Sequence, residues 1–380
     1  MMYINQKRLV EDFIMLAKIK SYSGQEKEVA STLFTILEQI GSSVKSKSTE
    51  ESSFSLSIDN TGNIYALLPG NTDGLEPVML CCHMDTVQPG EEIKPIIEDG
   101  IITNECAGIL GADDKAGIAA IIELLHVIIE NDLPHGDLEI VFTVMEEAGM
   151  AGSKSFSYNK LKSKIAYVLD GSMRPGLITT AAPYKNRINI KITGKAAHAG
   201  VTPEKGVSSI QVAAKAIDNM KLLRIDDITT ANIGIISGGT GENVVCSEVV
   251  MRAEVRSHDC KRLEEQTSHM HKSVDDAALY YGANAEFDTI LLYPGYSISE
   301  NDYLVRCFED ACDKTGLEFG TCISGGGSDA NIFNRSGIKA VVAGIGVKDP
   351  HTERESISVK DLTDTAALLV NLIGSLPRVE

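Results

Sequence analysis

Apolar residues recur along the chain with two periods, and these periods predict alternating helices and strands. Apolar positions at helical spacing predict helices over residues 5–19 and 29–40, and Gly41 is expected to end the second helix. The Ser23-Gly-Gln-Glu26 sequence before that helix is typical of a capping box. Short, almost wholly apolar runs predict buried strands at residues 63–68, 78–82, 138–144 and 165–169. A hairpin over residues 91–104 should turn at Asp99-Gly100, and a strongly apolar helix covers residues 118–129. The polar, Ser-rich residues 42–57 predict a loop or an irregular edge strand.

The pattern changes near Arg187 and later returns. The changed region predicts a strand at 187–193, a helix at 207–222, strands at 231–236 and 248–257, a helix at 260–281 and a strand at 285–292. This β-α-β-β-α-β order is that of a ferredoxin-like domain. The first pattern then resumes, with helices over 303–315 and 361–373 and strands over 317–323 and 340–343. We therefore expect an α/β protein. Residues 1–181 and 294–380 would form a mixed, mostly parallel sheet flanked by helices, and residues 182–293 would form an inserted ferredoxin-like domain.

Composition narrows the class of protein further. The 380 residues include 43% hydrophobic residues and carry a formal net charge of −18, which argues against nucleic acid or an anionic membrane as a partner. The eight cysteines form no Cys-x-x-Cys pair, and several lie in apolar runs, so reduced, buried thiols are expected. Neither a secretory signal nor a membrane-spanning apolar segment is visible, which predicts a cytoplasmic protein.

Histidine and acidic residues, both possible metal ligands, follow the predicted strands. They are His83, Asp85, Asp113, Glu146, Glu147, Asp170 and His351. Because the carboxyl ends of parallel strands meet at one edge of a sheet, these side chains are expected to gather there. Two imidazoles and several carboxylates suit zinc, or cobalt or manganese in a similar site. Of the paired Glu146 and Glu147, one could hold a metal while the other takes a proton from water that the metal acidifies.

Each of these signals also has a simpler interpretation. His83 could be a satisfied core histidine beside a capping Asp85, and His351 could be a surface loop residue. A Glu-Glu pair often begins a solvated helix, and Asp113-Asp114-Lys115 could compensate a helix dipole. Five separated elements of matching chemistry favour the metal site over these separate interpretations.

The same motifs resemble one protein family. They are His83-Met-Asp85-Thr, Gly111-Ala-Asp113-Asp114-Lys115-Ala-Gly117, Glu146-Glu147-Ala-Gly149, Asp170-Gly171 and the late His351. In order and spacing they are similar to the co-catalytic zinc exopeptidase and deacylase family that includes peptidase T, glutamate carboxypeptidase and aminoacylase. The resemblance covers nearly the whole chain, and the peptidase T-like branch is the most similar.

The resemblance implies a role for each of these residues. His83 and Asp170 would hold one zinc, Glu147 and His351 the other, and Asp113 would bridge the two. Asp85 would support the His83 side of the site and the base, and Glu146 would act as general base and then as acid. The family also holds the peptide bond after its bridging Asp in cis, which here is Asp113-Asp114.

The inserted domain resembles a lid that mediates dimers in this family. His198, in Ala196-Ala-His-Ala-Gly200, matches the family histidine that polarises the scissile carbonyl, often in the partner subunit's site; it could instead cap a helix. Asn243 and Arg256 match positions that hold polar groups of the substrate. Gly327 and Ser328 belong to a glycine-rich turn that lines the pocket. As a phosphate cradle, this turn would lack the Gly-Lys-Ser/Thr ending of a P-loop.

Together these features predict a metal-dependent peptidase that hydrolyses an amide bond of a short peptide, as a tripeptidase does. The resemblance implies two Zn²⁺ per subunit, with Co²⁺ or Mn²⁺ as possible replacements, and a homodimer formed through the inserted domain. Three alternatives remain open: a deacylase of N-acyl amino acids, a binding relative without catalysis, and a two-metal phosphoesterase. The extra arginine with which some carboxypeptidase members hold a substrate carboxylate has no evident counterpart, so the end of the substrate that is recognised is open. Hinges are expected near residues 180–181 and 292–294.

Overall fold

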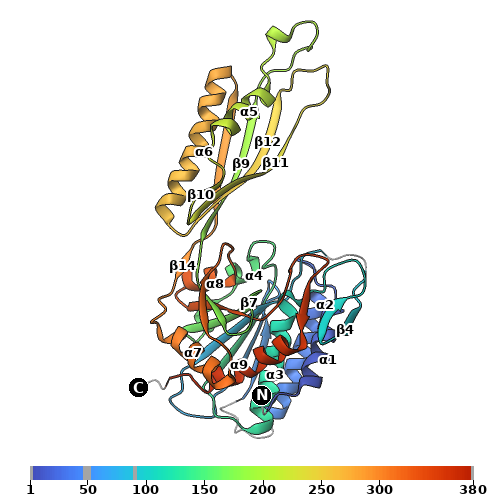
Figure 1. The fold of residues 1–380 in the computed structure, drawn as a ribbon, viewed down its shortest axis with the longest axis vertical. Helices are drawn as coiled ribbons and strands as arrows, with labels where there is room; N and C mark the ends of the chain where they lie inside the picture. Colours follow the sequence, from blue (N-terminus) through green and yellow to red (C-terminus); the bar gives the residue numbers. More distant parts are fainter. Residues whose placement is uncertain (1–2, 46–52, 89–91, 378–380) are drawn as a thin grey trace. The chain divides into compact units, whose positions relative to one another are not determined.

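The computed structural model describes residues 3–45, 53–88 and 92–377 and divides the chain into two compact units (Figure 1). Unit 1 comprises Met1–Ala181, Ser297–Ile323 and Ser328–Glu380, and unit 2 comprises Ala182–Tyr296 and Ser324–Gly327. The boundaries expected from the sequence, after residues 181 and 293, lie within three residues of the two crossings at Ala181 and Tyr296. The short segment Ser324–Gly327, which belongs to unit 2, was not predicted to do so.

Unit 1 is built on a mixed sheet that has nine strands among the described residues, in the order β1-β2-β6-β3-β7-β16-β8-β14, with β15 paired to β8. The strands are β1 (Ser55–Ile58), β2 (Ile64–Leu68), β3 (Val78–His83), β6 (Leu138–Thr143), β7 (Ile165–Gly171), β8 (Leu177–Ala182), β14 (Tyr296–Ser297), β15 (Gly320–Ile323) and β16 (Lys339–Gly344). The four central strands β6, β3, β7 and β16 run parallel to one another. Strands β3 and β6 are buried along their whole length, as their continuous apolar sequences predict. The carboxyl ends of the four central strands therefore share one edge of the sheet, and the predicted site residues follow those ends.

Helices flank this sheet. They are α1 (Gln6–Ala17), α2 (Lys27–Lys45), α3 (Ala112–Asn131), α4 (Ala151–Ser155), α7 (Tyr303–Thr315), α8 (Asp329–Arg335) and α9 (Val359–Ile373), with a 3₁₀ turn at Tyr158–Lys160. Helix α3 packs on β3 and β7 and also contacts α1 and α9, so it is buried around most of its circumference. Its apolar residues form one core with those of the sheet. The α/β class and the helix-flanked, mixed sheet are confirmed.

A small antiparallel sheet lies beside the site residues in unit 1. It consists of β4 (Pro95–Glu98), β5 (Ile101–Asn104) and β17 (Ser356–Ser358). The hairpin β4-β5 turns at Asp99 and Gly100, both with positive φ, as expected for a two-residue turn. Residue 91 of the predicted hairpin, and residues 46–52 of the predicted Ser-rich loop, lie outside the described residues.

Two predictions about helix α2 were wrong. The helix does not end at Gly41 but continues to Lys45, so Gly41 is an interior residue of the helix. Packing accounts for the glycine, since a Cβ atom there would come within 2.3 Å of the Phe54 ring. The predicted capping box does not form either. The hydroxyl of Ser23 instead donates a hydrogen bond to Asp85, and the carboxylate of Glu26 accepts from Gly24 and Met145.

Unit 2 has the ferredoxin-like topology that the sequence predicts. Its antiparallel sheet has the order β10-β11-β12-β9-β13. The elements are β9 (Tyr184–Thr193), a 3₁₀ turn (Pro203–Lys205), α5 (Ser209–Asn219), β10 (Leu223–Asp226), β11 (Thr229–Gly238), β12 (Glu248–Ser257), α6 (Cys260–Tyr281) and β13 (Asn284–Tyr293). Unit 2 buries its own apolar cluster between the sheet and the two helices. The short strand β10, at the edge of the sheet, was not predicted.

The structure also bears on two expectations from the composition, which concern membrane-spanning segments and the state of the cysteines. Among the described residues, no helix has both the length and the apolar character that crossing a bilayer requires. All eight cysteines are free thiols, and five of them are buried.

Candidate metal centre

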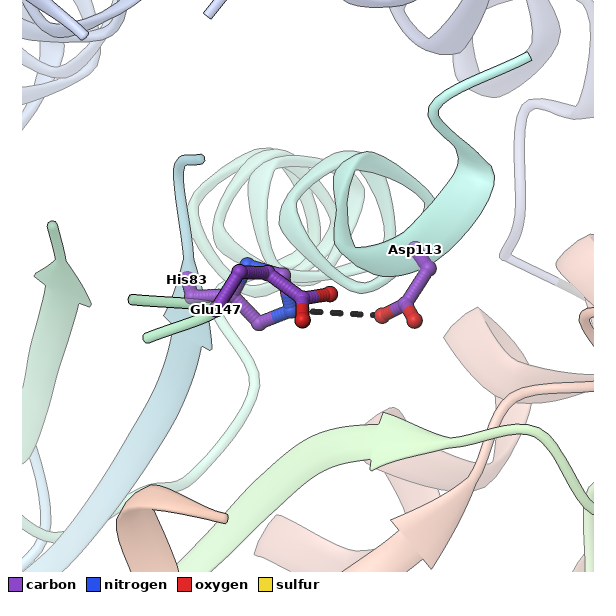
Figure 2. Close-up of side chains that lie close together, drawn as sticks. All are labelled: His83, Asp113 and Glu147. Atoms are coloured by element: carbon purple, nitrogen blue, oxygen red, sulfur yellow. Dashed lines mark hydrogen bonds and ion pairs between the residues drawn. The ribbon is translucent and has the colours of Figure 1, made fainter. Parts of the chain in front are cut away.

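Three side chains from separate elements of unit 1 converge at the carboxyl edge of the sheet. His83 is the last residue of β3, Asp113 lies in the first turn of α3, and Glu147 lies in the loop after β6. Figure 2 shows these three side chains close together. One possible ligand atom from each lies within 4.8 Å of those of the other two. Since β3 and β6 are parallel neighbours, their carboxyl ends place His83 and the loop after Thr143 side by side.

Asp113 lies between the two predicted histidine ligands. Its Oδ1 is 3.2 Å from Nε2 of His83, and its Oδ2 is 3.2 Å from Nε2 of His351. The same His351 nitrogen lies 2.5 Å from Oε1 of Glu147. On the other side, Nε2 of His83 is 3.7 Å from Oδ1 of Asp170, the penultimate residue of β7. All five residues that were predicted to hold metal thus form one chain of contacts.

The ring of His83 is fixed by its other nitrogen. Nδ1 lies 2.8 Å from the backbone carbonyl oxygen of Asp85. A carbonyl oxygen can only accept, so Nδ1 carries a proton. Nε2, which faces Asp113, is then the nitrogen at which a bound metal would replace a proton. This arrangement is common in histidines that bind a metal.

The carboxylate of Asp85 holds the loop that carries the paired glutamates. It accepts hydrogen bonds from the backbone amides of Glu146 (2.9 Å) and Glu147 (3.1 Å) and from the hydroxyl of Ser23 (2.6 Å). Burial would raise the pKa of Asp85, but the hydrogen bond and charge of His83 and these donors hold it below its ordinary value. Asp85 therefore stays ionised and links the His83 side of the cluster to Glu146 and Glu147.

Glu26 is a supporting carboxylate that sequence reasoning assigned to a different role. It is 6% exposed and accepts a hydrogen bond from the amide of Met145 at 3.0 Å. Met145 has a φ of 53°, a backbone conformation that a side chain with a Cβ atom rarely adopts, and this turn directs the next two residues toward Asp85. The only sequence signal for Glu26 was its apparent place in a capping box.

Glu355 supports the Asp113 side of the cluster, and the sequence did not predict this role. It is 2% exposed, and its two carboxylate oxygens accept from the amides of Gly111 (2.7 Å) and Asp113 (2.9 Å). It follows His351 in the loop that is closed by paired hydrogen bonds between Lys348 and Ser356. No local pattern marks it, because its partners lie more than 240 residues away along the chain.

The residue after Asp113 is also part of the support. The Asp113-Asp114 peptide bond is cis, as the family resemblance implies. Asp114 is fully buried; its Oδ2 accepts from the amide of His83 at 3.1 Å, and its Oδ1 has no hydrogen-bond partner within the described part of the chain. Burial raises the pKa of Asp114 well above its ordinary value.

The electrostatics of the cluster suit a bound cation. Burial raises the pKa of Asp170 to about 7, although the hydrogen bond to His83 opposes this. Burial, then the negative charge of Asp170, raises the pKa of Glu146 well above its ordinary value. Hydrogen bonds to Asp113 and then Glu147 raise the pKa of His351 to about 10. So many buried carboxylates around two imidazoles are unfavourable unless positive charge compensates them, and the donor set fits divalent metal.

The other predicted residues divide between the two units. His198 and Asn243 lie in unit 2, where both are exposed. Their segments are paired, since the amide of Ala199 donates to the carbonyl oxygen of Asn243 (2.9 Å) and His198 forms a β-bridge with Val244. The Nδ1 atom of His198 accepts from the amide of Gly200 at 3.1 Å, which leaves Nε2 as the nitrogen that could act on a ligand.

Arg256 and the glycine-rich turn have local roles. Arg256 makes two hydrogen bonds to the carboxylate of Glu254 and one to the carbonyl oxygen of Gly325. Gly327 packs on Tyr293 so closely that a Cβ atom would lie 2.4 Å from the ring. Ser328 caps helix α8 with its hydroxyl. Roles of Arg256, Gly327 and Ser328 with substrate stay predictions.

Comparison with known proteins defines the class. The model of peptidase family M20/M25/M40 matches residues 79–375. The chain is 38% identical over 370 residues to YqjE of Bacillus subtilis (strain 168), described as uncharacterized, which covers 97% of this chain and 98% of that protein. A crystal structure of aminopeptidase PepT from Bacillus cereus ATCC 10987 has 39% identity and a TM-score of 0.89, over 98% of this chain and 99% of that one. A tripeptidase from Staphylococcus aureus subsp. aureus Mu50 has 37% identity and a TM-score of 0.91, over 98% of each chain.

The protein belongs to peptidase family M20/M25/M40. The resemblance to the peptidase T branch, inferred from five motifs, is confirmed by these structural relatives.

Proposed function

We propose that this protein is a two-zinc peptidase that hydrolyses an amide bond of a short peptide, with tripeptides as the preferred length. The observation that carries the proposal is the position of Asp113, which presents one oxygen to His83 and the other to His351. Such a carboxylate can bridge two cations, one held by His83 and Asp170 and the other by Glu147 and His351. The names of the tripeptidase and PepT relatives support the substrate class.

Bound metal would supply Lewis-acid polarisation of the scissile carbonyl and would acidify water near it. Glu146 has the properties of the proton carrier. It is 9% exposed, its raised pKa allows it to hold a proton between steps, and its backbone is fixed by Asp85. We assign to it removal of a proton from the attacking water and delivery of that proton to the leaving amine.

We also propose that unit 2 acts as a lid and forms a homodimer, with His198 polarising the scissile carbonyl of the partner's site. An imidazole N–H aimed at a developing oxyanion lowers the barrier by a few kcal/mol, roughly. Sedimentation of the full chain tests the dimer. The His198→Ala variant tests the residue, since kcat should fall by at least about a hundredfold while metal content is unchanged.

A tripeptide library assay tests the reaction. The metal-loaded protein is incubated with tripeptides, dipeptides, N-acetyl amino acids and a phosphate monoester, with and without chelator, and products are identified by mass. We expect cleavage of tripeptides that stops with chelator and resumes when zinc is restored. Cleavage of only the N-acetyl amino acids, or of only the phosphate ester, would contradict the proposal.

The Glu146→Gln variant separates proton transfer from metal binding. Glutamine keeps the size of the side chain but cannot accept and return a proton, so turnover should fall by about a thousandfold or more while two metals remain bound. Glu105→Gln, at an exposed loop position, is the matched control and should keep full activity. Near-normal turnover in Glu146→Gln, or loss of its metal, would overturn the role.

A further inference from the structure

The sheet of unit 2 has one face that no helix of that unit covers. Helices α5 and α6 pack on the other face (Figure 1), against alternate residues of β9 and β12 such as Ile188, Ile190 and Met251. The residues between them in sequence point to the uncovered face, because successive side chains of a strand alternate. The structure describes every residue of unit 2, including all those on this face.

Cations gather on the uncovered face around one carboxylate. Lys185 and Arg187 of β9 lie beside Glu254 and Arg256 of β12, with Arg187 directly opposite Glu254 and Lys185 opposite Arg256. Arg252 precedes Glu254 by two residues and so shares its face. Four cations therefore lie around Glu254, and Asp288 of β13, opposite Asn189, is a further carboxylate on the same face.

The carboxylate of Glu254 already has two cationic partners. Glu254 makes an ion pair with Lys185 at 2.7 Å and another with Arg256 at 2.8 Å. Arg187 lies opposite Glu254 on β9, and Arg252 lies two residues before it on β12. Neither arginine forms an ion pair with a residue of unit 2. Both are exposed, so their guanidinium groups are available to a ligand.

The sheet is hollowed at this point. A cavity of about 210 Å³ is lined by Lys185, Arg187, Asn232, Gly234, Arg252 and Glu254, together with Ile235 and Ala253. The register of β11 against β12 shifts between Ile233 and Ile235, so Gly234 lies in a bulge, and its missing side chain keeps the hollow open. The Asn232 amide adds a polar group to the wall.

The local charge contrasts with that of the whole chain. The protein carries a net charge of −18, yet acidic and basic residues nearly balance in unit 2, so almost all of the excess negative charge belongs to unit 1. Paired guanidinium groups bind oxyanions with short, charge-assisted hydrogen bonds, and arginine suits carboxylate and phosphate geometry better than lysine does. The small cavity suits one such group, and a folded partner would not fit in it.

We propose that Arg187 and Arg252 form a binding site for a small oxyanion on the uncovered face of unit 2. The anion is either a carboxylate of a short peptide, in which case the site contributes to substrate recognition and rests on the proposed function, or a free phosphate-type anion. Both sources share the chemistry that the two arginines recognise.

The test compares two double variants of the full, metal-loaded protein. Arg187→Gln with Arg252→Gln removes both guanidinium groups from the hollow. Lys215→Gln with Lys272→Gln removes the same charge from exposed positions of α5 and α6, on the other face, and is the matched control. Binding of inorganic phosphate is measured by titration calorimetry, and KM is measured for a tripeptide and for its C-terminal amide.

The expected result is that the arginine double variant loses at least about tenfold in phosphate affinity while the control binds as the wild type does. If the natural anion is the terminal carboxylate, KM for the tripeptide also rises about tenfold and KM for the amide does not change. If it is a free anion, only phosphate binding changes. Unchanged phosphate binding together with unchanged KM in the arginine variant would overturn the site, and because the calorimetric measurement needs no turnover, it does so independently of the proposed peptidase activity.

Discussion

Asp85 links the metal-ligand candidate His83 to Glu146, the residue that we propose as the base, through different atoms of one residue. Its backbone carbonyl fixes the ring of His83, and its carboxylate binds the amides of two consecutive residues, Glu146 and Glu147. A buried carboxylate that accepts several N–H and O–H donors is a rigid anchor, because moving any one partner leaves a buried acceptor unsatisfied. Small changes around Asp85 should therefore appear as changes in catalysis before they appear as unfolding.

Ser23 offers a direct test of that anchor. Ser23→Ala removes the 2.6 Å hydrogen bond from its hydroxyl to Asp85 and leaves the two amide donors in place. We expect kcat for a tripeptide to fall several-fold, with a loss of about 1 kcal/mol in the free energy of unfolding. Ser31→Ala is the control, since the Ser31 hydroxyl is exposed and bonds only within its own helix. Equal kcat in the two variants would show that Ser23 does not position the site.

Glu355 should control metal affinity without touching metal. In Glu355→Gln one carboxylate oxygen becomes an NH₂ group, which faces the amide of either Gly111 or Asp113 and cannot accept from it. The backbone at Gly111 and Asp113 then loses one of the two hydrogen bonds that hold it. Loss of a supporting residue of this kind typically changes metal affinity by about 10–100-fold. Competition with a chromogenic chelator measures the change. Glu353→Gln, an exposed neighbour in the same loop, should bind metal normally, and the same loss in both variants would contradict the assignment.

At the scale of elements, helix α3 packs closely against the sheet at Gly117. A Cβ atom there would lie 2.5 Å from Oδ1 of Asp114, 2.6 Å from the carbonyl oxygen of Leu169 and 2.8 Å from Sγ of Cys82. The last two contacts belong to β7 and β3, so the missing side chain sets the distance between helix and sheet.

Gly117→Ala should therefore destabilise the protein, although alanine is the better helix former by about 1 kcal/mol. Overpacking against backbone costs typically about 1–3 kcal/mol and would shift α3, which carries Asp113. Urea unfolding gives the stability, and bound zinc per chain gives the effect on the site. Gly374→Ala is the control, because a Cβ atom there makes only ordinary contacts of 3.6 Å and beyond. A Gly117→Ala variant as stable as the wild type would show that α3 can move away from the sheet at little cost.

Elements with a long or strongly periodic signal could be predicted from the sequence, and those fixed by tertiary contacts could not. Helices α6 and α7 and the buried strands β3 and β6 follow their apolar patterns closely. Gly41 was wrongly predicted to end α2, because its packing against Phe54, which accounts for a glycine inside the helix, leaves no local sequence signal. Short elements such as β10, β17 and α8 were missed because a few residues carry too little periodicity.

In the candidate site, too, some residues could be predicted from the sequence and others could not. Ligand candidates could be predicted because imidazole and carboxylate groups follow strand ends, and the structure brings all five together. The supporting roles of Glu26 and Glu355 could not be predicted, because both residues act by accepting hydrogen bonds from backbone amides of distant segments. An acidic residue in a polar loop has no sequence feature that distinguishes this role from simple solvation.

At the scale of the whole molecule, the two units have separate hydrophobic cores and unequal charge. The unit 1 core is built on the mixed sheet, and the unit 2 core lies between its own sheet and helices α5 and α6. All five metal-ligand candidates belong to unit 1. Metal should therefore stabilise one unit and leave the other nearly unaffected.

Removal of metal tests this division. A ligand at a hundred times its Kd stabilises the state that binds it by about 2.7 kcal/mol, so a chelator should lower the Tm of unit 1 by roughly 5–10 °C. Hydrogen–deuterium exchange followed by mass spectrometry assigns the change, because peptides of β3, β6 and α3 should lose protection while those of β9, β12 and α6 keep it. In His351→Gln, where a half-exposed ligand candidate is removed, the chelator should shift Tm less than in the wild type. Equal loss of protection in both units would mean that the two cores unfold as one cooperative body, and the separate roles of the units would have to be abandoned.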